Sequence, residues 1–336
     1  MRFITSFAPL IAGTLLMCRR HAQVLAWPDP EPFKGEIPHN DREITMDPAL
    51  MRRGSDNKMF LFTTGVHQGV GSVWTAPSIR GPWTKSAANA FGESDHEPWN
   101  APYVHYVDGV YYLYYSNQYN YVSEGGVQDA EAGKFWHASS LNVRSSKTME
   151  PGSWKPRGRL PIPWARRYNI LDGSVLTIGE EPDQKREHLL TFGSYQEGIF
   201  QLILADPPVT LAPNAGKHIM HLAQNMTSGG LAHPDPIEAG FIWWTGKWYY
   251  LFFSSGRCTR EPDDSWASAG DAYKVMVCRS VYPQGGYVDK EGRDCLMESG
   301  GTLVLGSHGN VWAPGGQGVM ILPEVGGPIL YYHYGE

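Results

Sequence analysis

The chain has 336 residues, 42% of them hydrophobic and 18% charged, which predicts a buried core and excludes wholesale disorder. Its 28 Lys and Arg residues are outnumbered by 34 Asp and Glu residues, giving a formal net charge of -6, and no basic run exceeds a pair, so a nucleic-acid backbone is excluded as a partner. The 12 Trp, 18 Tyr, 12 Phe, 38 Gly and 25 Pro residues favour many short strands joined by turns and therefore an all-β protein.

Residues 1–26 are predicted to be a secretory signal peptide. Arg2 precedes an apolar stretch that begins at Phe3, and small or short side chains stand before a cleavage point at Trp27. A membrane anchor is the alternative, but about fifteen apolar residues are fewer than the ~20 that span a bilayer. The rest of the chain, 27–336, is therefore expected to be extracellular, with no membrane partner.

An aromatic or aliphatic strand recurs along this segment. Each copy opens with a turn rich in Gly, Asp or charged residues and stops at a small or polar residue. The copies are DNKMFLFTTG (56–65), DGVYYLYYSN (108–117), KREHLLTFGS (185–194), TGKWYYLFFSS (245–255) and GGPILYYHYGE (326–336). Near-continuous apolar strands are typically covered on both faces. Their spacing of about 50 to 80 residues predicts one four-stranded sheet per copy with variable loops, and a five-bladed β-propeller as a single domain, with a β-sandwich as the rival.

Three cysteines remain after the signal: Cys258, Cys278 and Cys295. An oxidising compartment favours one disulfide and one spare thiol, and none of the spacings is that of a metal site. Because Cys278 and Cys295 are separated by a short segment that a hairpin could close, we predict that they are bridged. Cys258 is then free or partnered intermolecularly.

Carboxylates are the candidate catalytic groups. The chain lacks a GxGxxG after a strand, a P-loop, a GxSxG elbow and an HExxH pair, which excludes nucleotide chemistry, α/β-type serine hydrolysis and zinc proteolysis. Asp47, Asp172 and Glu238 each stand in an apolar stretch near the start of a repeat. The innermost strands of a propeller line one axis, so these positions could converge into the pair of carboxylates that glycoside hydrolysis needs. Alternatively, each Asp merely starts a turn.

The motifs that carry these carboxylates resemble glycoside hydrolase family 43, closest to its endo-1,5-α-L-arabinanases. The resemblance extends in order from about Asp47 to the C-terminus, through ITMDPALMR, WNAPYVHYVDGVYYLYYS, ILDGSVL, FGSYQEGIFQL, PIEAGFIWWTGKWYYLFFS and WAPGGQGV. It implies a five-bladed propeller and an inverting hydrolase of arabinose-containing plant cell-wall polysaccharide. It further implies that Asp47 is the general base, Asp172 modulates the pKa of the acid, and Glu238 is the general acid.

The resemblance also implies sugar contacts at Trp99 and Tyr195, although core packing is the alternative for Trp99. Asp235 would be the acid if Glu238 were not. Relatives carry a histidine in a GPGHN stretch associated with an axial ion, whereas this chain has Gly316 there and His308 is no obvious substitute. We therefore expect no required cofactor, with an axial calcium or other ion as the open alternative.

The last blade is expected to be short, because relatives add strands beyond the one that ends at Glu336. A monomer is expected. Alternatives to the endo activity are an exo-acting α-L-arabinofuranosidase or β-xylosidase of the same family, and a carbohydrate-binding propeller without catalysis.

Overall fold

The computed structural model describes most of the chain from Met46 onward. The described residues are 46–65, 71–92, 97–119, 128–129, 134–135, 138–179, 184–225, 236–258, 267–268, 270–298 and 300–335. The predicted signal peptide and Asp235 lie outside them.

Four antiparallel four-stranded sheets follow one another along the chain, and each is built from strands that are consecutive except that β7 and β8 interrupt the second sheet. The first contains β1 (Ala49–Arg52), β2 (Met59–Phe62), β3 (Val73–Ala76) and β4 (Thr84–Lys85). The second contains β5 (Asn100–Val107), β6 (Val110–Tyr119), β9 (Ala138–Ser146) and β10 (Lys155–Arg159). The third contains β11 (Ser174–Ile178), β12 (Glu187–Phe192), β13 (Ile199–Leu204) and β14 (Met220–Ala223). The fourth contains β15 (Ile237–Trp244), β16 (Tyr249–Ser255), β17 (Lys274–Ser280) and β18 (Thr302–Leu305).

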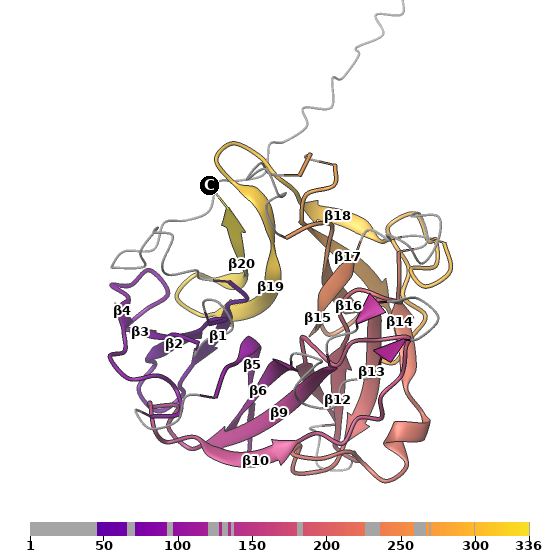
Figure 1. Cartoon of the computed structure of the whole chain (residues 1–336). Helices are drawn as coiled ribbons and strands as arrows, with labels where there is room; N and C mark the ends of the chain where they lie inside the picture. The colour runs from indigo at the N-terminus through magenta and orange to yellow at the C-terminus, as the bar shows by residue number, and fades with distance from the viewer. Residues whose placement is uncertain are drawn as a thin grey trace, which may run out of the picture.

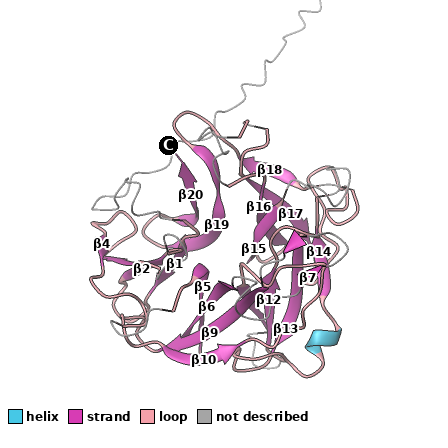
Figure 2. Ribbon diagram, in the orientation of Figure 1, coloured by secondary structure: helices cyan, strands magenta, loops and turns pink. Residues whose placement is uncertain are grey.

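Two further sheets have two strands each. One pairs β19 (Trp312–Leu322) with β20 (Gly327–Gly335), and the other pairs β7 (Gln128–Asp129) with β8 (Lys134–Phe135). The helix among the described residues is the three-residue 3-10 turn η2 (Ala215–Lys217), so Figure 2 is almost entirely strand and loop. None of the described residues lies in a helix with the length and apolarity needed to cross a bilayer.

The sheets stand around a central axis as a β-propeller (Figure 1). The first strand of each sheet is innermost, and contacts run in a ring from β1 to β5, β11, β15, β19 and back to β1. The prediction of an all-β propeller is confirmed, and a sandwich is excluded because the sheets do not form two facing layers.

Hydrophobic side chains fill the spaces between neighbouring sheets. Tyr115 of β6 packs with Phe62 on the face of the strand toward the first sheet. Tyr114, the preceding residue, points to the opposite face and packs with Phe192 of the third sheet. Successive side chains of a strand point to opposite faces, so a strand between two neighbours needs apolar residues at nearly every position. This explains the continuous apolar runs of the repeated strands.

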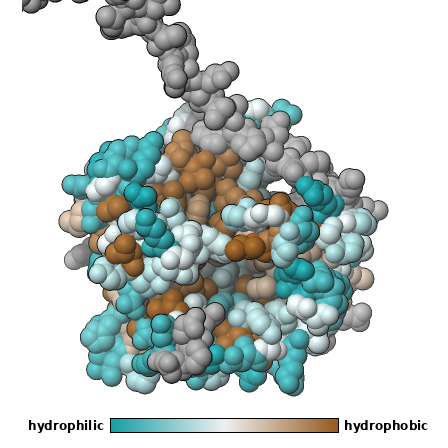
Figure 3. All heavy atoms as spheres, turned by 180° about the vertical axis from the view of Figure 1, so that it is seen from behind, coloured by the Kyte–Doolittle hydropathy of each residue, from teal (hydrophilic) through white to brown (hydrophobic). Residues whose placement is uncertain are grey.

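A cavity at the axis is lined by residues of β1, β5, β11, β15, β19 and β20, among them Tyr103, Phe241 and Tyr331. The cavity therefore lies along the innermost strands, beyond the turns at which these strands begin. Figure 3, which views the molecule from behind, shows hydrophobic side chains gathered in several patches on that face.

The predicted disulfide is present between Cys278 of β17 and Cys295, with an S–S distance of 2.08 Å. Both residues are buried in the core between the third and fourth sheets. Cys258 is the free cysteine of the described residues, so the predicted pairing is confirmed.

Candidate active site

The chain takes up a left-handed backbone conformation at or just before the start of each innermost strand. The residues concerned, all with positive φ, are Asp47 (49°), Ala101 (45°), Asp172 (56°), Ala239 (54°) and Ala313 (49°). Each is followed by Pro or Gly. Positive φ is uncommon outside glycine and clusters at functional sites. Two of the predicted carboxylates occupy this turn, and Glu238 directly precedes it.

A polar side chain in or just after the second strand of each sheet forms a hydrogen bond near the start of the first strand of the next sheet. Thr64 Oγ1 accepts from Ala101 N at 2.8 Å, Ser116 Oγ accepts from Asp172 N at 3.1 Å, Ser194 Oγ donates to Glu238 Oε2 at 2.6 Å, Ser254 Oγ accepts from Gly316 N at 2.9 Å, and His333 Nδ1 accepts from Asp47 N at 3.0 Å. We call these five contacts the inter-sheet clamps. The last one joins β20 to the turn before β1 and so completes the ring.

Glu238 lies near the start of β15 and receives hydrogen bonds on both carboxyl oxygens. Ser194 Oγ donates to Oε2 at 2.6 Å and the Tyr273 hydroxyl donates to Oε1 at 3.0 Å. Burial raises the pKa of Glu238, the two hydroxyls and the Cys258 thiol partly offset this, and the negative charge of Asp47 raises the pKa further. The net pKa lies above the usual range of a glutamic acid, which favours a protonated carboxyl.

Asp172 lies beside Glu238. Its Oδ2 accepts a hydrogen bond from the backbone N–H of Ala239 at 3.2 Å. Burial raises the Asp172 pKa well above its ordinary value, and the nearby charges of Glu238 and Asp47 raise it further. The three carboxylates therefore converge from the first, third and fourth sheets, as the sequence predicted.

Asp47 keeps its side chain partly exposed, at 27% of the full area. Its Oδ2 accepts a hydrogen bond from Thr64 Oγ1 at 2.5 Å, and its Oδ1 lies 3.7 Å from His333 Nδ1. One carboxylate oxygen is thus held in place while the side chain keeps contact with solvent.

Tyr195 follows Ser194 and opens onto this group. Its side chain is 44% exposed, its backbone N–H donates to Ile237 O at 3.1 Å, and it has a positive φ of 57°. Partial burial raises its pKa, and the nearby Glu238 charge raises it further. The structure therefore places Tyr195 beside Glu238, where its ring can meet a ligand.

The prediction that Trp99 is a sugar-binding surface is wrong. Its side chain is fully buried between the first and second sheets, with its ring edge-on to Phe62 and Tyr115 at centroid distances of 6.1 and 6.3 Å. A Cβ at Gly71 would stand 2.0 Å from Trp99 Nε1, so the backbone there closes over the ring. Core packing, the alternative reading, is the correct one.

His333 is the functional candidate that the sequence analysis missed. It takes the axial space beside Gly316, where a Cβ would stand 2.6 Å from His333 Nδ1 and 3.2 Å from Asp47 Oδ1. Its side chain is 8% exposed and its ring stacks on Tyr273 at 5.8 Å. The signal was a lone polar residue in the apolar YYHY strand, at the place where the other repeats have Ser or Thr.

The axial position offers one nitrogen, His333 Nε2, to an ion, because that atom is buried and makes no hydrogen bond to a described residue. Gly316 has no side chain to offer, His333 Nδ1 accepts from Asp47 N–H, and His308 Nδ1 hydrogen-bonds with Gly306 O at 2.8 Å in the turn before β19. Within the described part of the chain, no three His, Cys, Asp or Glu side chains are grouped as metal ligands would be.

Comparison with known proteins agrees with this arrangement. A family model described as glycosyl hydrolases family 43 matches residues 86–336. The chain belongs to this family. It is 41% identical over 295 residues to the arabinan endo-1,5-alpha-L-arabinosidase A of Aspergillus aculeatus, covering 86% of this chain and 81% of that protein. It is 40% identical over 306 residues to a probable arabinan endo-1,5-alpha-L-arabinosidase C of Aspergillus flavus, with the same coverage.

The fold is shared with a solved arabinanase structure. The Cellvibrio cellulosa alpha-L-arabinanase complexed with arabinohexaose superposes with a TM-score of 0.64 at 24% identity, over 87% of each chain. The resemblance inferred from the motifs is therefore confirmed, and the chain is a glycoside hydrolase by family.

Proposed function

We propose that the protein is an endo-acting hydrolase of α-1,5-linked arabinan. The observation that carries this proposal is the convergence of Asp47, Asp172 and Glu238, with Glu238 held in a setting that favours its protonated form. The substrate follows from family 43 relatives named for arabinan that are about 40% identical over most of both chains. Linear arabinan of plant cell walls is the expected partner.

Glu238 is the proposed general acid. It gives its proton to the glycosidic oxygen as the bond between that oxygen and the anomeric carbon breaks. The pKa of an acid must lie near the working pH, and burial together with the charge of Asp47 moves the Glu238 pKa in that direction. Asp172 is proposed to help raise the pKa of Glu238, because its carboxyl lies beside Glu238 and the two repel when both are ionised.

Asp47 is the proposed general base. Its partly exposed carboxylate takes a proton from a water molecule, whose oxygen attacks the anomeric carbon from the face opposite the leaving group. This displacement inverts the anomeric configuration. The Thr64 and His333 hydrogen bonds orient Asp47 for this step. The proposal requires no metal ion.

Tyr195 is proposed to bind a sugar ring against its exposed face, next to the acid. We also propose that β19 and β20 are the inner strands of a fifth blade. Five left-handed turns and five inter-sheet clamps support this, because the β19–β20 hairpin repeats both features. A secreted monomer with a cleaved signal peptide completes the proposal.

Sizing the products of linear arabinan over time tests the activity. We expect intermediate oligosaccharides early and short ones late, whereas release of monomeric arabinose alone from the start would exclude endo action. Glu238→Gln should lower the rate on arabinan by about 10²–10⁴-fold, because an amide cannot donate the proton. Glu324→Gln, a surface change, is the matched control.

Aryl arabino-oligosaccharides test the role of the acid separately. A good leaving group needs little protonation, so Glu238→Gln should be impaired much less on them than on arabinan. Equal losses on the two substrates would remove Glu238 from the role of general acid.

A further inference from the structure

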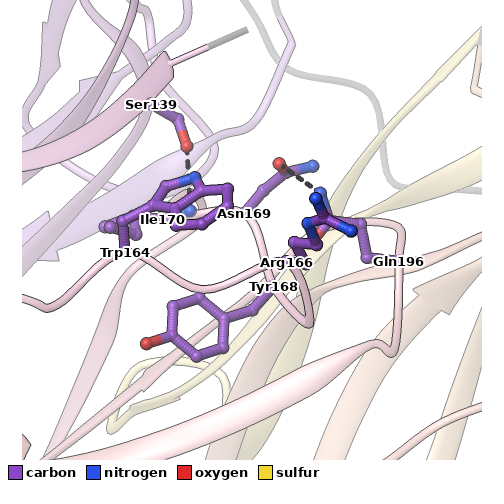
Figure 4. A pocket seen from close by; sticks show the side chains of 7 residues that line it. All are labelled: Ser139, Trp164, Arg166, Tyr168, Asn169, Ile170 and Gln196. Carbon is purple, nitrogen blue, oxygen red and sulfur yellow. Dashed lines mark hydrogen bonds between the residues drawn. The ribbon is translucent and has the colours of Figure 1, made fainter. Parts of the chain in front are cut away.

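A second pocket lies beside the candidate active site. It is lined by Ser139, Trp164, Arg166, Tyr168, Asn169, Ile170 and Gln196. Figure 4 shows the Trp164 ring on one side of this pocket and the Arg166 and Gln196 side chains on the other. Trp164 is 52% exposed, although a tryptophan ring is among the side chains that gain most from burial. We call this the Trp164 pocket.

The loop that carries Trp164 is fixed rather than loosely placed. The Tyr168 hydroxyl donates to Pro163 O at 2.5 Å, and this hydrogen bond links the residues before and after Trp164 in the loop. The Tyr168 ring is buried against Phe192 and Phe200 of the third sheet. An aromatic surface held in this way can bind a ligand at little cost in conformational entropy.

Gln196 provides an acceptor for such a ligand. Tyr195 and Gln196 have consecutive positive φ values of 57° and 49°, a strained conformation of the kind found at ligand-binding sites. Gln196 Nε2 donates to Asn169 Oδ1 at 3.1 Å, whereas Gln196 Oε1 is buried and makes no hydrogen bond to any residue that the structure describes. A buried acceptor of this kind is normally satisfied, and a ligand hydroxyl would satisfy it.

The Trp164 pocket is connected directly to the catalytic carboxylates. Asn169 Nδ2 donates to Ser194 O at 2.9 Å, and the hydroxyl of the same Ser194 donates to Glu238. Asn169 is also three residues before Asp172, so their Cα atoms are at most about 11 Å apart. A polymer bound across Glu238 reaches the pocket within a few sugar units.

The pocket has a cavity volume of about 10 Å³, which is room for one oxygen atom and not for a sugar ring. We propose that the exposed Trp164 ring at its mouth is a distal subsite for an arabinofuranosyl unit of the bound chain, with the pocket receiving one hydroxyl of that unit. The C–H face of the sugar packs on the Trp164 ring, and one of its hydroxyls donates to Gln196 Oε1. This inference rests on the proposed function, since it takes its ligand from the arabinan that occupies the active site. It predicts that the enzyme favours longer oligosaccharides over short ones.

Binding of arabinotriose and arabinohexaose, measured by calorimetry in a Glu238→Gln background, tests the subsite. Trp164→Ala should weaken arabinohexaose binding by about fivefold to thirtyfold, the range expected for loss of a tryptophan anchor, and weaken arabinotriose binding less. Trp164→Phe, which keeps a ring, should recover part of the loss. With active enzyme, Trp164→Ala should raise KM on arabinohexaose more than it lowers kcat.

Trp244→Ala is the matched control. Trp244 is 42% exposed but is the sixth residue after Glu238 on β15, about 20 Å along the strand from the acid. It should leave both binding constants unchanged. Equal losses for the two oligosaccharides, or none, in the Trp164→Ala variant would overturn the subsite while the arabinan activity stands. Failure of the parent enzyme to cleave arabinan would overturn both proposals.

Discussion

The Tyr273 hydroxyl offers a direct test of how the acid is tuned. Tyr273 is 2% exposed and donates to Glu238 Oε1 at 3.0 Å. Tyr273→Phe removes that donor but keeps the ring, which is stacked on His333. Since the bond stabilises the ionised carboxylate, its loss should raise the Glu238 pKa further above the usual range.

The size of the effect follows from the bond that is lost. A hydrogen bond to a charged group contributes about 1.5–3 kcal/mol, and the lower end applies because Ser194 still donates to the other oxygen. About 1.4 kcal/mol corresponds to one pH unit. A general acid works while protonated, so the alkaline limb of the rate profile should move about one unit to higher pH. The acidic limb, which reports the base, should stay in place.

The measurement is kcat/KM on linear arabinan across the acidic to alkaline range, with Tyr282→Phe as the control because that side chain is 69% exposed. Circular dichroism checks that the variant is folded. An alkaline limb that does not move, or that moves to lower pH, would refute the assignment of that limb to Glu238.

Three further predictions concern the stability of the fold and the geometry of the site. Asp172→Asn should raise the melting temperature at neutral pH and lower the activity. The pKa of Asp172 is raised in the folded state, so ionisation of this carboxyl lowers the stability of the fold as pH rises above the unfolded pKa of about 3.9. The gain should vanish below that pH in calorimetric scans, and a gain that persists there would contradict the electrostatic cause. His333→Phe leaves the Asp47 N–H without its acceptor, so it should lower kcat and should lower the unfolding free energy by about 1–3 kcal/mol. His333→Asn offers an oxygen near the position of Nδ1 and should recover part of both losses. If Phe and Asn behave alike in both assays, the hydrogen bond is not what matters. Replacing Cys278 and Cys295 together by Ala should lower the unfolding free energy by about 3 kcal/mol, the value expected for a bridge between residues separated by 17 positions. An unchanged denaturation midpoint would contradict the presence of the bridge.

The propeller and the convergence of the carboxylates were predictable because both follow from local patterns. A strand covered by neighbours on both faces needs an apolar run, and such runs recur in the sequence at 59–62, 110–115, 189–192, 249–253 and 329–332. A carboxylate near the start of an innermost strand then lies at the axis. The left-handed turn could also have been read, since Asp or Ala followed by Pro or Gly recurs at each innermost strand.

Trp99 and His333 could not be placed from the sequence because their environments come from distant segments. Whether the Trp99 ring faces solvent or core depends on Phe62 of the first sheet and on Gly71 in the connection before β3. The partner of His333 is Asp47, 286 residues away along the chain. The repeat marks His333 as a polar position like the Ser and Thr of the other copies, but it does not identify Asp47 as the residue opposite.

The inter-sheet clamps make catalysis a property of the complete ring. Each clamp fixes a residue near the start of an innermost strand with a side chain from the preceding sheet, so Asp47, Asp172 and Glu238 each depend on a neighbouring sheet for part of their positioning. A chain that has not yet produced β20 already contains Asp47, Asp172 and Glu238, yet the Asp47 N–H lacks its His333 acceptor. Hydrolysis should therefore begin only once synthesis has passed His333, and the appearance of activity should report ring closure more sharply than any spectroscopic measure of strand content.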